Sequence, residues 1–135
     1  MILNTNQFGK LEVEEEHILN FKDGIIGFEE YKRFVIVTDK DFEPIFWLVS
    51  ADDPNLEFPI LNPLLFYPDY DPEIIIESPD KTFFAVVSFR KEISNTTINL
   101  KAPIIVDIAN KTGEQIVINN DKYTTDHSLL ISKGD

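Results

Sequence analysis

The sequence predicts an all-β protein, a small antiparallel β-barrel-like domain with at most short helical turns. Its composition favours strands, since 18 Ile, 8 Val and 11 Phe stand against only 4 Ala. β-Branched and aromatic side chains suit a pleated, half-buried surface, whereas Ala is the best helix former. Eight Pro and five Gly divide the 135 residues into short segments. A series of about eight to ten short strands at close spacing is typical of a small barrel or sandwich.

The strands of the N-terminal half are predicted from their apolar residues, at 11–13, 31–38, 45–49 and 56–61. The apolar run from Phe34 to Val37 is continuous rather than alternating, which indicates burial on both faces of that strand. Pro59 cannot donate a hydrogen bond to a neighbouring strand, so we expect the strand at 56–61 to lie at an edge or to carry a bulge. Gly27 lies in a short apolar bend and is expected to supply a backbone angle that other residues avoid.

The C-terminal half is predicted to contain strands at 73–77, 82–90 and 96–102 and a hairpin that joins 104–109 to 114–119. Gly113 ends the polar segment of this hairpin and is expected to belong to its turn. Three prolines interrupt residues 62–72, which argues against a regular helix or a central strand there. Helical turns are expected only at 29–32 and in the C-terminal tail. We expect a single domain over residues 1–123 and a tail over 124–135.

The charge balance bounds the partners of this protein. Lys and Arg together number 12, and Asp and Glu number 24, so the formal net charge is −12. Binding a phosphate backbone needs a basic surface that releases counterions, so we expect no direct binding of nucleic acid. An acidic surface suits a basic protein partner, because opposite potentials steer association, although solubility alone also accounts for it.

Cysteine and long apolar runs are both missing from the sequence. Without Cys, a disulfide framework and a thiolate metal site are excluded. No apolar run approaches the roughly 20 residues that span a bilayer, and the first residues lack the pattern of a signal peptide. We therefore expect a soluble, cytoplasmic protein that does not associate with a membrane.

Few residues offer catalytic or metal-binding chemistry. His17 and His127 are the two histidines, and neither has a second ligand at zinc spacing. The triplet Asp69-Tyr70-Asp71 could hold a hard cation, but it lacks the Gly and the spaced acids of a calcium loop. The sequence therefore predicts no catalytic residue, no metal site and no cofactor, and hence no enzyme. A metal-dependent small hydrolase that uses Asp69 and Asp71 remains an alternative.

Acidic and aromatic residues adjoin one another in the proline-rich loops of this sequence. Protein interfaces combine charges that steer a partner with aromatic side chains that anchor it. We therefore interpret these residues as candidate partner contacts, with the acids meeting a basic partner. The candidates are Phe46 as an anchor, together with Asp52, Asp53, Asp69, Tyr70 and Asp71.

Several sequence blocks occur in the order found in one bacterial family. The blocks are Phe8–Val13, Ile18–Phe21, Gly24–Glu29, Lys32–Val35, Phe46–Ser50, Asp52–Pro54, Pro63, Pro68–Tyr70, Thr97–Ile104, Gly113–Ile118 and Tyr123. Each block is weak alone, but the whole set resembles the flagellar assembly factor family, FliW. Two segments depart from the family pattern: 71–81 is shorter than the usual acidic insertion, and 126–129 replaces the usual basic-His-Pro-Leu ending.

The resemblance implies a non-enzymatic regulator with an antiparallel β-barrel-like fold. Its partners would be flagellin and CsrA, a small basic RNA-binding regulator of translation. By this resemblance, captured CsrA no longer represses flagellin translation, and accumulating flagellin occupies the protein and frees CsrA. A chaperone that binds flagellin only remains a second alternative.

Overall fold

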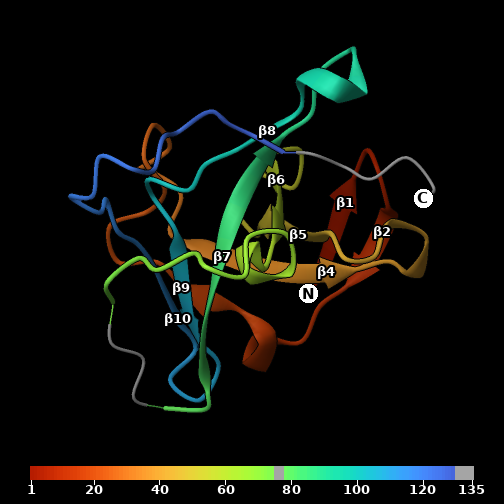
Figure 1. Ribbon diagram of the computed structural model, residues 1–135. Coiled ribbons are helices and arrows are strands. Elements are labelled where there is room, and N and C mark those ends of the chain that lie inside the picture. The colour runs from red at the N-terminus through yellow and green to blue at the C-terminus, as the bar shows by residue number, and fades with distance from the viewer. Residues whose placement is uncertain (75–77, 130–135) are drawn as a thin grey trace.

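The computed structural model describes residues 1–74 and 78–129, which form an almost entirely β fold (Figure 1). The strands of the described residues are β1 (Ile2–Thr5), β2 (Gly9–Glu12), β3 (Leu19–Asn20), β4 (Arg33–Thr38), β5 (Phe46–Ser50), β6 (Glu57–Leu61), β7 (Lys81–Ser88), β8 (Thr97–Ile98), β9 (Ile104–Asp107), β10 (Thr112–Gln115) and β11 (His127–Ser128). Short 3-10 turns lie at η1 (Glu15–His17), η2 (Lys40–Phe42), η3 (Pro63–Leu65) and η4 (Ile93–Asn95). The all-β prediction is thereby confirmed.

Seven strands close into a barrel. Their hydrogen-bonded order is β7, β6, β5, β4, β3, β10, β9, and β9 pairs back onto the first half of β7. The pairs are antiparallel except for β3 and β10, which run parallel. The second half of β7 pairs with β8, and β11 pairs with β8 in turn. Figure 1 shows β7 as the long strand that runs past β9 and reaches β8.

The barrel interior is filled by alternate side chains of its strands, because successive residues of a strand point to opposite faces. The buried members of this interior cluster are Leu19, Phe21, Ile25, Phe34, Leu48, Ile60, Ile104 and Val106. Phe34 and its neighbour Val35 are both buried, but only Phe34 belongs to the interior cluster. The prediction that this strand is covered on both faces is therefore confirmed.

The β1–β2 hairpin covers the outer face of β4 and β5. Leu3 and Val13, from the hairpin and the residue after it, pack with Val35, Trp47 and Val49 in a second cluster. β1 was not predicted, because Ile2–Thr5 is a short segment without clear alternation. It is held as a strand by its register with β2 and by its buried outer-face contacts.

The outer face of β6 and β7 carries a third cluster, which is the base of the site described below. Ala85 and Val87 of β7 pack there against irregular segments from 62–72 and 116–129. These segments contribute Tyr70, Ile118, Tyr123 and Leu129, all of which are buried. Long-range packing, rather than regular secondary structure, therefore fixes the irregular segments.

The position of β6 differs from expectation. β6 is not an edge strand, since β5 and β7 pair with it on either side. Pro59 is tolerated because β7 pairs only with Ile60 and Leu61 of β6, so the missing N–H of Pro59 lies before that pairing begins.

Two glycines were expected to supply unusual backbone angles or turn positions. Gly113 lies within β10 opposite Val106 and not in the hairpin turn, where Lys111 adopts the left-handed conformation instead. Gly27 has the positive φ that was expected.

The predicted turns and the tail also need correction. The 3-10 turns do not include 29–32, and each spans only three residues. Glu73 and Ile74 form no strand, and the rest of the strand predicted at 73–77 lies outside the described residues. The tail predicted at 124–135 contributes β11 and the buried Leu129, while 130–135 lie outside the described residues. The domain boundary at residue 123 stays a prediction.

Gly113 is required by the ring of Phe21, and this requirement can be tested. A Cβ at residue 113 would lie 2.1 Å from the Phe21 ring. We expect Gly113→Ala to lower the free energy of unfolding by about 1–3 kcal/mol, because overpacking forces the core apart. Urea denaturation measures this loss, and Thr112→Ala, at the exposed neighbouring position, should change stability by less than about 0.5 kcal/mol.

A second substitution separates this clash from the loss of backbone freedom. In a Phe21→Leu background the smaller side chain leaves room, so Gly113→Ala should cost clearly less than it does alone. Residues in contact show such coupling in a double-mutant cycle. Equal costs in both backgrounds would contradict the assignment of Gly113 to ring packing.

Candidate functional site

The candidate contact residues lie at two separate places. Asp52 and Asp53 follow the last residue of β5, whereas Asp69, Tyr70 and Asp71 follow β6. β5 and β6 are antiparallel, with Phe46 opposite Ile60, so the two loops leave these strands at opposite ends. The structure therefore does not bring the predicted acids together into one site.

The loop after β5 is a turn stabilised by its own side chains. The backbone N–H groups of Asp52 and Asp53 both donate to the hydroxyl of Ser50, at 3.1 and 3.0 Å. The Asp52 carboxylate accepts two hydrogen bonds from Arg33, and this ion pair raises the pKa of the guanidinium. Asp53 caps the turn by accepting from the N–H of Asn55. These acids thus have local structural partners.

Phe46 begins β5 and packs with the interior cluster. Its ring meets that of Phe84 edge-to-face, with centroids 5.8 Å apart. The side chain is half-buried, so much of it is committed to the fold. A role of Phe46 as a partner anchor stays a prediction.

The segment that carries Asp69 and Asp71 is shaped by capping and by the tyrosines around it. Asn62 caps η3 by accepting from the N–H of Leu64, and Pro63 occupies the first position of the turn, where a missing N–H costs nothing. The chain then turns again, so that Asp71 donates its N–H to the hydroxyl of Tyr123 at 2.8 Å. The Asp69 and Asp71 side chains remain exposed.

Tyr70 is a core residue and only 5% exposed, which its sequence position between two acids did not indicate. Its hydroxyl donates to the carbonyl oxygen of Leu100 at 2.7 Å, and its ring meets those of Phe83 and Tyr123 edge-to-face. Burial, together with the nearby Tyr123, raises the pKa of Tyr70 far above the ordinary value of 10.0. Tyr70 therefore positions the loop.

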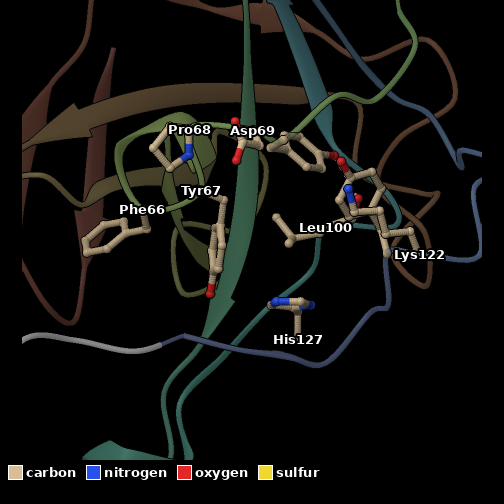
Figure 2. Close-up of a pocket in the computed structure, with 9 residues that line it drawn as sticks. Phe66, Tyr67, Pro68, Asp69, Leu100, Lys122 and His127 are labelled. Atoms are coloured by element: carbon tan, nitrogen blue, oxygen red, sulfur yellow. Dashed lines mark hydrogen bonds between the residues drawn. The ribbon is translucent and has the colours of Figure 1, made fainter.

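A cleft of about 370 Å³ opens beside this loop (Figure 2). We call it the aromatic cleft; its lining residues are Phe66, Tyr67, Pro68, Asp69, Tyr70, Leu100, Lys122, Tyr123 and His127. In Figure 2, Tyr67 and Lys122 lie on opposite sides with Leu100 between them, and Phe66 points away. Asp69 lies at one end of the cleft and His127 at the other. The aromatic cleft is thus mainly apolar, with charges at its margin.

The sequence predicts two residues of this cleft as contacts, Asp69 and Tyr70, but not the others that line it. Leu100, Lys122 and His127 come from segments 30 to 60 residues away in the chain, and no local pattern joins them to Tyr67. Tyr67 is held by a hydrogen bond from its hydroxyl to the carbonyl oxygen of Ser128 and by an edge-to-face contact with His127. Burial raises the pKa of the Tyr67 hydroxyl.

The side chains that line the aromatic cleft are of the kinds found where proteins bind other molecules. Within residues 1–74 and 78–129, no three His, Asp or Glu side chains gather as metal ligands would. Nor does any helix in the described part of the chain have the length and apolar character needed to cross a membrane. Rigid aromatic walls beside exposed carboxylates suit recognition of another molecule.

Comparisons with known proteins identify the family. The family model of the FliW protein matches residues 2–129. The chain belongs to the FliW family. The flagellar assembly factor FliW of Alkaliphilus metalliredigens is 37% identical over 140 residues, which cover 96% of this chain and 86% of that protein. That of Caldanaerobacter subterraneus is 39% identical over 140 residues, covering 96% and 93%.

A solved structure gives the same result in three dimensions. The crystal structure of the flagellar assembly factor FliW matches this chain with a TM-score of 0.87 at 29% identity. The match covers 98% of this chain and 99% of the solved one. The two proteins therefore share one fold over nearly their whole length.

The role of Tyr70 in this FliW-family chain predicts a pH dependence of stability. Tyr70→Phe should lower the free energy of unfolding by about 1 kcal/mol at pH 7, because the hydrogen bond to Leu100 is lost. Because the pKa of Tyr70 is raised in the folded chain, the protonated hydroxyl contributes its full stabilisation below pH 10. Above pH 10 the unfolded chain loses this proton before the folded chain does, so the stabilisation decreases as the pH rises. The stability difference between wild type and variant should therefore shrink above pH 10.

Urea denaturation at pH 7, 9 and 10.5 measures this difference. Tyr31→Phe serves as the matched control, because Tyr31 lies outside the third cluster. A difference between wild type and Tyr70→Phe that stays constant or widens with pH would show that the Tyr70 hydroxyl is not buried as described.

Proposed function

We propose that this FliW-family chain is a cytoplasmic, non-enzymatic regulator that binds flagellin and a CsrA-type RNA-binding regulator. While it holds the regulator, repression of flagellin translation is relieved. When unassembled flagellin accumulates, flagellin occupies the chain and the regulator is released. Family membership over residues 2–129 supports this proposal, because relatives that match 96% of this chain are named flagellar assembly factors.

The observation that carries the proposal is the exposed acidic loop beside the aromatic cleft. Asp69 and Asp71 are exposed next to apolar walls, on a protein whose formal net charge is −12. Acids of this kind accelerate encounter with a basic protein, and apolar side chains hold it afterwards. Leu65, in the turn that precedes the cleft, is 61% exposed and enlarges the apolar surface.

The second acidic loop, with Asp52 and Asp53, is proposed as a further contact. It leaves β5 at the end opposite Phe46, so it would reach a different part of a partner or a different partner. Asp52 is already paired with Arg33, which lowers the charge that this loop presents. We therefore place the main contact at Asp69 and Asp71.

The two alternatives differ in what supports them. A metal-dependent hydrolase would need ligands around Asp69 and Asp71, and the described residues offer no cluster of three. A chaperone that binds flagellin only would use the same surface and would lack the second partner. The proposal is therefore tested with each partner singly and then together.

The direct test is a binding measurement with purified monomeric flagellin and purified CsrA-type regulator. Each should bind the chain with saturation, and flagellin added to the preformed complex should release the regulator. Binding of flagellin alone, with no complex with the regulator, would support the chaperone alternative. Binding of neither protein would contradict the proposal.

Charge reversal tests the steering role of the loop. Asp69→Lys/Asp71→Lys should lower the association rate constant by about tenfold in 50 mM salt and by less in 300 mM salt, since salt screens exposed charges. Dissociation rates should change less. Stopped-flow or surface-binding kinetics measure both rates.

The matched control for net charge is Glu15→Lys/Glu16→Lys, which changes two exposed acids of η1 that do not line the cleft. It should reduce the association rate by clearly less than the loop variant. Equal effects of both variants would show that net charge alone steers the partner, with no special part for Asp69 and Asp71.

A further inference from the structure

One cation already lies over an aromatic ring of the cleft. The Lys122 ammonium lies 5.7 Å from the centroid of the Tyr123 ring, within the range of a cation–π interaction. Lys122 is exposed and also lines the cleft. The Tyr123 ring therefore already faces a positive charge, which is carried by a flexible side chain.

The opposite wall is aromatic and held in place. The hydroxyl of Tyr67 donates to the carbonyl oxygen of Ser128, and the Tyr67 ring meets His127 edge-to-face at 5.1 Å. Tyr67 is half-buried and lines the cleft, so part of its ring is available to a guest. Because the Tyr67 side chain is already held by these two contacts, it loses little conformational freedom when a ligand binds.

Asp69 supplies the opposite charge. Its side chain is exposed and lines the cleft. The ion pairs found among the described residues are Arg33–Asp52 and Lys101–Asp121, so Asp69 takes part in neither. A carboxylate beside aromatic faces is the combination that recognises a cation with an extended apolar stem.

The geometry points to the aromatic cleft as a binding site for one arginine side chain of a basic partner peptide, with the guanidinium between Asp69 and Tyr67. A guanidinium stacks on aromatic faces and forks onto a carboxylate, which an ammonium cannot do. Leu100, at the base, would contact the methylene stem. At about 370 Å³ the cleft is near the small end of ligand pockets, which suits a single long side chain.

Substitution of Lys122 tests whether the ligand of the cleft is a cation or an anion. A guest cation would compete with Lys122 for the cleft, so removing the Lys122 charge should tighten binding. Removing the Asp69 charge should weaken it. A guest anion would give the opposite pair of effects. His127 also lines the cleft and is left unchanged in every variant.

The inference deepens the proposed function and rests on it for the source of the arginine, but the site is tested without either partner protein. The probes are N-acetylarginine amide, N-acetyllysine amide and the neutral isostere N-acetylcitrulline amide, added to the full chain and followed by amide NMR shifts. We expect the arginine probe to bind with a millimolar Kd and to shift residues 66–71 and 122–128. The lysine probe should bind about threefold and the citrulline probe about tenfold more weakly.

The variants are chosen so that folding is preserved. Asp69→Asn and Lys122→Gln both change exposed side chains. Asp69→Asn should raise the Kd of the arginine probe about fivefold, whereas Lys122→Gln should lower it about twofold. Tyr67→Leu should weaken binding of this probe by removing the aromatic face, whereas Tyr67→Phe keeps the ring and should bind nearly as wild type does. The pair separates the ring from the hydrogen bond to Ser128.

Several results would overturn the assignment. They are binding of the citrulline or lysine probe as tight as that of arginine, opposite signs for Asp69→Asn and Lys122→Gln, and the absence of saturable shifts at 50 mM probe. These results are distinguishable from a failure of the proposed function. If the chain binds the arginine probe but neither flagellin nor the regulator, the arginine site is supported and the proposed function is contradicted. If the chain binds both proteins but not the arginine probe, only the arginine site is contradicted.

Discussion

Closure of the barrel between β7 and β9 is the constraint on which the rest of this structure depends. Four residue pairs, from Lys81–Asp107 to Phe84–Ile104, join the two ends of the strand order and remove an open edge there. Closure also turns alternate side chains inward, so that Phe34, Leu48 and Ile104 share one interior. Because β7 extends beyond β9, its second half is free to pair with β8 and to bring the C-terminal segments onto the outer face.

The candidate site follows from that outer face. Ala85 and Val87 of β7 belong to an apolar surface against which irregular segments are packed, together with Ile98 of β8. Tyr70 and Tyr123 cover this surface and hydrogen-bond to the backbone of neighbouring segments, which fixes a loop that has no regular structure of its own. The acids on the loop are then exposed at a defined place beside the aromatic cleft. A binding role is consistent with this division, since the buried tyrosines supply rigidity and the exposed acids supply contact.

The pattern of apolar residues predicted those strands whose own residue preferences agree with their packing in the barrel. The runs around Phe34 and Trp47 are continuous, β-branched and aromatic, and both became barrel strands covered on two faces. Gly113 was assigned to a turn because Gly often occurs there, but its reason is the ring of Phe21, which is distant in sequence. The burial of Tyr70 is likewise not evident from the sequence, because it depends on Leu100 and Tyr123 rather than on the neighbouring acids. The family resemblance, in contrast, rested on block order and needed no knowledge of packing.

Amide hydrogen exchange of the full chain, alone and with each purified partner, tests the central claim most directly. The claim is that a rigid barrel binds other polypeptides through the loop and cleft formed by 64–71 and 121–128. We expect partner binding to slow exchange in these two segments while the barrel strands β4 and β5 change little. Protection confined to the loop at 51–56, or no protection at all by saturating partner, would contradict the account.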